Sequence, residues 1–292
     1  MHTLDLILKD IQREFIAIPG VGKNIEEVSI KGIKAYTSST LKKNVKKSLS
    51  KNVSSKIFKL VSSLIDQNRI IPIFTSKNII QHFMRRKEYH PLGTTIGDKF
   101  YLFIESFYGK FKITSVDEKE LAKTVMHELM HVANNLNRKQ FLKINYKVII
   151  EFYKTFFTEY LEIKNSSQVN DSIFEEIIKY QTKAKKTGTI NFWKMLLPIF
   201  KKLEKYDNNM TDNDYKKAFN ILGDYLDTSF EKFTENIPTN IFKSAKKAYE
   251  KIGCKVFQTF AQEMWTASEI ICILAQENPN HPNVYKTINL LK

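Results

Sequence analysis

The sequence is poor in the residues that build disulfide-bonded or turn-rich proteins. Its 292 residues include 2 Cys, 9 Gly and 7 Pro. Two cysteines cannot form a disulfide framework, and so few Gly and Pro cannot supply the many turns of an all-β sandwich. We expect Cys254 and Cys272 to be buried thiols, because on one straight helix they would lie about 27 Å apart, beyond disulfide reach. These shortages favour a helix-rich protein.

Long apolar runs are also missing. No window approaches 18 uninterrupted apolar residues, so the sequence predicts no membrane span. Asp5 and Asp10 interrupt the apolar positions near the N-terminus, and no basic segment followed by an apolar core is present, so we expect no signal peptide. The predicted location is the cytoplasm, or an assembly such as a viral particle that packages or delivers the protein.

Acidic residues are the third shortage. The chain has 31 Asp and Glu against 46 Lys and Arg, a net charge of +15. This charge would attract nucleic acid or an acidic protein surface, and an AT-rich genome that enriches Lys, Asn and Ile explains it as well. Five lysines at helical spacing predict a solvated helix face, with a partner-binding arm as the alternative. They are Lys42, Lys43, Lys46, Lys47 and Lys51.

The order of predicted elements is a mixed α+β part followed by a helical part. Short strands are expected at residues 69–74, where Pro72 suits an edge position, and at 99–107. Turns are expected around residues 90–97. A capping box at Ser115 and Glu118 predicts a helix that ends near Leu136.

The helical part is expected to begin near residue 139. Its predicted helices include one that Pro198 kinks or breaks and a long one over about residues 242–276. We therefore predict a predominantly helical α+β fold with a small mixed or antiparallel sheet. The predicted division is a basic N-terminal segment, 1–54, and a domain of residues 55–292 with a helical insert at about 139–240.

Residues 124–135 contain the motif HELMH, formed by His127, Glu128 and His131 with two apolar residues between. Random placement of 6 His and 31 acidic residues gives about 0.013 such matches in the chain. Side chains at i and i+4 share a helix face, so the two imidazoles can meet at one Zn²⁺. The structural alternative is an ordinary helix with two histidines. The apolar residues expected to bury this helix are Leu129, Val132, Ala133 and Leu136.

A catalytic zinc site needs a third protein ligand. Asn134 and Asn137 stand where the extended HExxHxxGxxH motif has Gly and His. If residues 242–276 form one helix, Glu263 lies within an apolar stripe, where a buried carboxylate needs a partner such as a metal ion or a lysine. Glu269 would then point about 120° away and be exposed or outside the ligand set. We therefore predict His127, His131 and Glu263 as the zinc ligands.

These residues resemble the gluzincin division of the zincin metallopeptidases, which pair an HExxH helix with a glutamate from a later helix. The resemblance implies a zincin-like domain and one catalytic Zn²⁺, held by His127, His131 and Glu263. It also implies that Glu128 is the general base and acid, and that a strand near the helix forms the rim of the substrate cleft. The sequence departs from the family at Ala267, where an acidic residue commonly follows the ligand glutamate.

The expected function is that of a zinc endopeptidase, which hydrolyses a protein or peptide substrate with a metal-activated water and Glu128 as general base. The alternative is a basic component that binds nucleic acid or protein and keeps this fold with structural zinc or vestigial activity. Four residues are candidates to stabilise the oxyanion, and the sequence does not choose among them. They are Tyr146, Tyr153, Tyr225 and His90.

Overall fold

The protein is a predominantly helical α+β protein, as predicted. The computed structural model describes residues 25–30, 33–73, 92–104, 115–183, 189–206, 210–227, 239–255 and 266–292. Contacts divide the chain into two compact units, the first comprising Met1–Phe141 with Pro279–Lys292 and the second Leu142–Asn278. Within the described ranges, no helix has the length and apolar character needed to cross a membrane.

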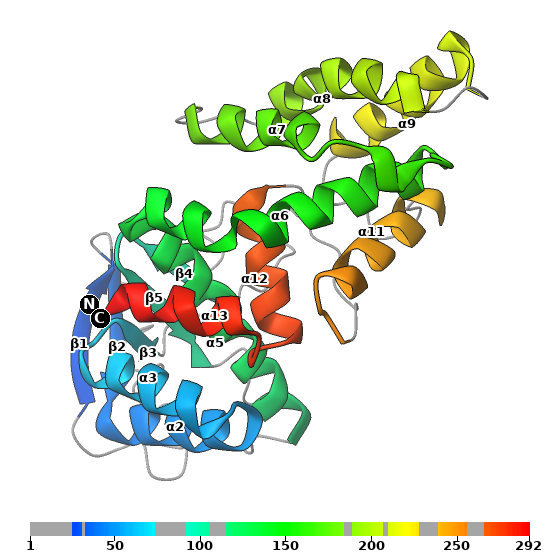
Figure 1. Cartoon of the computed structure of the whole chain (residues 1–292). Helices are drawn as coiled ribbons and strands as arrows, with labels where there is room; N and C mark the ends of the chain where they lie inside the picture. Colours follow the sequence, from blue (N-terminus) through cyan, green and yellow to red (C-terminus); the bar gives the residue numbers. More distant parts are fainter. Residues whose placement is uncertain are drawn as a thin grey trace. The chain divides into compact units, whose positions relative to one another are not determined.

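The first unit contains two small sheets (Figure 1). β1 (Ile25–Ile30) pairs antiparallel with β2 (Ile33–Ser38). The second sheet has the order β3-β5-β4, with β3 (Ile70–Ile73) parallel and β4 (Gly93–Ile96) antiparallel to β5 (Lys99–Phe103). The strands expected at 69–74 and 99–107 are thus confirmed as β3 and β5, except for residues 74 and 105–107, which lie outside the described residues. Within this sheet Pro72 is on an edge strand, as its missing N–H requires.

The two sheets share an apolar core. The side chains that form it come from β1, β2, β3 and β5, and Val28 and Ile96 pack against them. The buried members are Ile30, Ala35, Ile71, Ile73, Tyr101 and Phe103. This core holds the β3-β5-β4 sheet in place beside the helix that carries the HELMH motif.

Strand β4 was not predicted, because residues 90–97 were interpreted as turns. Its four residues, GTTI, are too short to show a clear alternation, and glycines stand at both ends. The structure explains why glycine stands at both positions. Gly97 has φ of +61° in the tight turn to β5. A Cβ at Gly93 would overlap the ring of Phe100, which packs against the backbone there.

Gly93→Ala is expected to destabilise the first unit by about 1–3 kcal/mol, because the buried Phe100 ring has to move to admit a methyl group. Urea unfolding followed by circular dichroism measures the change. Thr94→Ala on the same strand is the control and should cost less. Equal stability of the Gly93 variant and the unchanged protein would contradict the close approach of Phe100.

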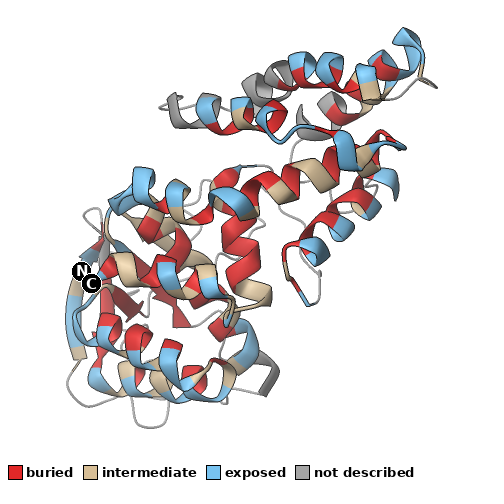
Figure 2. Ribbon diagram, viewed as in Figure 1, coloured by how far each residue is buried: buried red, intermediate tan, exposed pale blue. Residues whose placement is uncertain are grey.

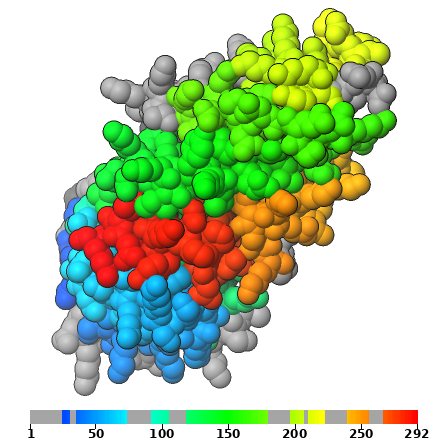
Figure 3. All heavy atoms as spheres, in the orientation of Figure 1, coloured from blue at the N-terminus to red at the C-terminus, as the bar shows by residue number. Residues whose placement is uncertain are grey.

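Four helices complete the described part of the first unit. They are α2 (Ser39–Asn52), α3 (Ser55–Asp66), α5 (Ser115–Leu136) and α13 (Pro282–Ile288). α2 packs on α3 and α5, and α13 returns from the end of the chain to pack on α5 and α3. Figure 3 shows the spheres of the C-terminal residues directly against those of α3, where the Lys56 ammonium lies 3.7 Å from the Tyr285 ring centroid. The helix predicted from Ser115 to Leu136 is therefore confirmed as α5.

The lysine-rich segment forms α2, and several of its lysines contact other residues of the first unit. Lys42 donates to the Asn68 side chain at 2.8 Å. Lys46 lies 2.5 Å from Asp66, and Lys51 lies 2.8 Å from Glu118. Although such surface pairs contribute little stability, they give part of this basic face an intramolecular role.

The second unit is built from helices around aromatic side chains. Its helices are α6 (Arg138–Tyr160), α7 (Ser172–Lys183), α8 (Thr189–Leu203), α9 (Asp212–Asp227), α11 (Thr239–Lys251) and α12 (Ala267–Glu277). Phe152 packs on Tyr249 of α11 with ring centroids 4.6 Å apart. Phe157 contacts Phe200 of α8 at 5.9 Å. Figure 2 shows the resulting buried faces along α6 and α12.

Pro198 does not break its helix. α8 runs continuously from Thr189 to Leu203 with Pro198 inside it. Leu197 and Pro198 are exposed, whereas Leu196 and Ile199 are buried. The burial of the helix on both sides of the proline holds the chain helical despite the missing backbone hydrogen bond.

The single helix predicted for residues 242–276 is wrong. α11 ends at Lys251, and Gly253 follows with φ of +103°, a left-handed conformation that ends helices. α12 begins separately at Ala267, where the Thr266 side chain accepts from the Glu269 N–H. The predicted direction of the Glu263 side chain requires one continuous helix, and residues 256–265 lie outside the described residues.

Candidate metal centre

The HELMH helix presents both histidines on one face, as the spacing predicts. The His127 and His131 ring centroids are 5.1 Å apart, and their planes meet at 68°. Both side chains are half-buried, while Leu129 on the other face is fully buried. Leu136, which was expected to be buried, is 44% exposed because it ends the helix. The apolar side of α5 therefore fixes the orientation of the two imidazoles.

Glu128 is held by a neighbouring strand. The Thr95 hydroxyl of β4 donates to Oε2 of Glu128 at 2.7 Å. Asn135, two turns further along α5, donates to the backbone oxygen of Gly97 at 3.5 Å. These contacts tie α5 to β4 and to the turn that follows it, and the first leaves Oε1 of Glu128 available to a substrate or a water molecule.

Thr95→Val is expected to reduce kcat of the proposed peptidase about ten-fold, because the lost hydrogen bond no longer orients Glu128. KM and zinc content should change little, since a positioning residue does not bind either. Thr95→Ser, which keeps the hydroxyl, should restore the rate. Thr94→Val is the matched control, because neighbouring strand residues point to opposite faces. An equal loss in the Thr94 variant would assign the effect to the strand's stability.

α12 carries a second pair of possible metal ligands. Glu269 and Cys272 are three residues apart, which places them on the same helix face. Glu269 is 5% exposed and Cys272 is fully buried. The expectation that Glu269 is exposed is therefore wrong, because α12 is buried on nearly all sides and its phase is not that of one long helix. Glu263 lies outside the described residues, so its predicted ligand role stays a prediction.

A buried phenol lies close to this pair. Burial raises the pKa of Tyr249 well above its ordinary value, and the nearby ionisable groups of Cys254 and Glu269 add to the shift. Tyr249 therefore stays protonated at neutral pH. Glu269 is itself buried beside this phenol, and a buried carboxylate is costly and favours a cationic partner.

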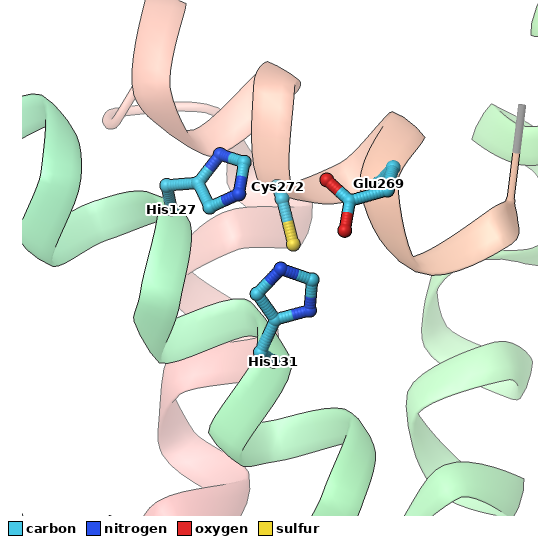
Figure 4. Close-up of side chains that lie close together, drawn as sticks. All are labelled: His127, His131, Glu269 and Cys272. Carbon is cyan, nitrogen blue, oxygen red and sulfur yellow. The ribbon is translucent and has the colours of Figure 1, made fainter. Parts of the chain in front are cut away.

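Four side chains form a group with the chemistry of a metal site. One ligand atom each from His127, His131, Glu269 and Cys272 lies within 4.8 Å of the others (Figure 4). Atoms that share a tetrahedral Zn²⁺ lie roughly 3.3–3.8 Å apart, so side-chain adjustments of about 1 Å suffice to bind an ion. Imidazole, carboxylate and thiolate are all zinc ligands. The donor set fits zinc, and the group could hold a metal ion.

Cys272 was missed as a ligand candidate. Both cysteines were interpreted as buried thiols, and both are indeed buried without a disulfide. The signal that could have identified Cys272 is its i+3 spacing from Glu269.

The structure describes some of the other candidate residues, the tyrosines and histidines outside the HELMH motif, and not the rest. The Tyr146 hydroxyl donates to Glu175, and burial, followed by this hydrogen bond, raises its pKa to about 12. Tyr153 is fully buried in the aromatic core. His281 caps α13, where its Nδ1 accepts from the Asn283 N–H at 3.2 Å. His90 and the side chain of Tyr225 lie outside the described residues.

Comparisons with known proteins give no family for this chain. No protein-family model, no curated protein and no solved structure matches it significantly. The function of the protein is therefore inferred from the side chains described above.

Proposed function

We propose that the protein is a zinc-dependent endopeptidase with a zincin-like catalytic site. The observation that carries the proposal is the convergence of His127, His131 and Glu269 within 4.8 Å, with Glu128 adjacent in sequence but outside this group. Two histidines and a carboxylate are the ligand set of several zinc peptidases. In this proposal Glu269 takes the ligand role for which the sequence suggested Glu263.

In this site, a bound zinc ion supplies a Lewis acid that activates water and polarises the scissile carbonyl. Glu128 accepts a proton from the attacking water and delivers it to the leaving amine. The Thr95 hydroxyl holds one oxygen of Glu128, so the other oxygen is kept in position for this proton transfer. His127 and His131 are held in position for the metal ion because the opposite face of their helix is buried in the core.

The substrate would bind along β4 as an added strand. Among the described residues, β4 pairs with β5 on one side and has no strand on the other. An edge strand offers backbone donors and acceptors to an extended peptide. Because Thr95 lies on β4 and contacts Glu128, a peptide paired there would have its backbone close to the general base.

Removal of the metal should abolish the proposed activity. Purified protein is treated with a chelator, and cleavage of an unfolded protein substrate is followed by mass spectrometry. Activity should fall to background and return when one equivalent of Zn²⁺ is added to the chelator-free protein. Activity that survives complete removal of the metal would contradict the proposal.

A second candidate is a binding or assembly component with structural zinc. The observation that favours it is the fourth donor, Cys272, because structural zinc sites are closed by four protein ligands. Such a protein would bind zinc but cleave no substrate. The positive charge predicts nucleic acid as its partner, and affinity for DNA or RNA that falls steeply with salt concentration would support this role.

A further inference from the structure

Cys272 has no place in the proposed mechanism, yet its sulfur belongs to the group that would hold the ion. It lies on α12 and is fully buried. Figure 4 shows the Cys272 sulfur pointing toward the His131 ring, with the Glu269 carboxylate on one side and His127 on the other. The three other ligand atoms all lie within 4.8 Å of the sulfur.

The chemistry of sulfur makes this position significant. Thiolate is a soft ligand that binds Zn²⁺ strongly. Three protein ligands leave one tetrahedral position, and a catalytic site needs that position for water. A sulfur atom at this distance is therefore placed to compete with the attacking water.

We propose that Cys272 is a reversible fourth ligand that closes the metal centre, so that the peptidase is latent until the sulfur leaves. This inference depends on the proposed function. In the closed state the thiolate donates an electron pair to the ion, and its proton has passed to solvent. On opening, that bond breaks, the sulfur is protonated again, and water takes the position. No group is oxidised or reduced.

The second cysteine offers a matched control. Cys254 is also buried, and burial, followed by the Glu277 carboxylate, raises the pKa of its thiol to about 12. It therefore stays a neutral thiol at physiological pH, and it is not part of the group of four. Substituting Cys254 removes one buried thiol without removing a proposed ligand.

Cobalt substitution of the full-length protein tests the inference directly. Co²⁺ bound by a thiolate gives an intense sulfur-to-metal charge-transfer band in the near ultraviolet, whereas the visible bands report Co²⁺ held by any ligand set. The charge-transfer band should be present in the unchanged protein and in Cys254→Ala, and lost in Cys272→Ala. The visible bands should persist in all three, because His127, His131 and Glu269 remain.

Activity supplies the second measurement. With zinc bound, Cys272→Ala should cleave an unfolded substrate about ten-fold faster or more than the unchanged protein, because its fourth position is open. Cys272→Ser keeps the side-chain volume but offers a weaker ligand, so it should show the same changes. It replaces the alanine variant if that variant folds poorly. Cys254→Ala should leave the rate unchanged.

Each contrary result has a distinct meaning. Visible cobalt bands without the charge-transfer band in the unchanged protein would overturn the role of Cys272 and leave the peptidase proposal intact. A charge-transfer band that Cys272→Ala removes without raising activity would overturn latency. No cobalt binding at all would overturn the proposed metal centre itself.

Discussion

Glu128→Gln is expected to reduce peptide hydrolysis by about 10²–10⁴-fold while zinc binding stays near one ion per chain. Glutamine keeps the shape of the side chain but cannot accept the proton from the attacking water. Its oxygen can still accept from Thr95, so the contact between α5 and β4 is preserved. Steady-state cleavage of a peptide substrate and metal analysis of the same preparation measure both quantities.

The control for this variant lies on the same helix. Glu120→Gln removes one negative charge from the exposed surface of α5 and should leave kcat unchanged. Cleavage by the Glu128 variant at the rate of the Glu120 variant would exclude Glu128 as the general base. Loss of zinc from Glu128→Gln would instead place Glu128 among the ligands.

The second large effect concerns Glu269, the proposed third metal ligand. Glu269→Ala should lower zinc content from about one ion per chain to nearly zero at micromolar free zinc. Losing a direct ligand costs more than the ~10–100-fold in affinity that follows loss of a supporting residue. Dialysis against buffered zinc, followed by metal analysis, gives the stoichiometry and the apparent Kd. His131→Ala is the positive control, since the motif and the geometry both include it.

Glu263→Ala is the decisive comparison, because the sequence and the structure favour different glutamates. We expect it to retain zinc, since the group of four does not require it. Loss of zinc from Glu263→Ala, with zinc retained in Glu269→Ala, would restore the original prediction. Glu269→Gln separates charge from packing, because it fills the same buried volume as a neutral group.

Local patterns predicted the HELMH helix well. The i, i+4 spacing needs just one turn of helix, and a capping signal at Ser115 marks where that helix begins. The strands β3 and β5 were also predictable, because each is a short run of branched or aromatic residues. In these segments local sequence and tertiary packing favour the same conformation.

The positions of Glu269 and Cys272 on α12 were not predictable by the same means. The direction of a side chain in an apolar helical region depends on where each helix begins, and Gly253 interrupts a region that otherwise has helical periodicity. An error in that one break changes which glutamate is predicted to face the core. Strand β4 was not predicted for a related reason. Its position depends on pairing with β5 and on the close approach of Phe100, and a segment of four residues cannot encode either of them.

The return of α13 to the first unit affects the order in which the chain can fold. Asn280 accepts from the Ser54 N–H at 3.1 Å, and Val284 and Ile288 are buried. During synthesis, N-terminal segments leave the ribosome first. Here the core of the first unit lacks α13 until the intervening 142–278 segment has emerged. The nascent HELMH helix would therefore gain its final packing late in translation, which would delay any proteolysis until most of the chain has been made.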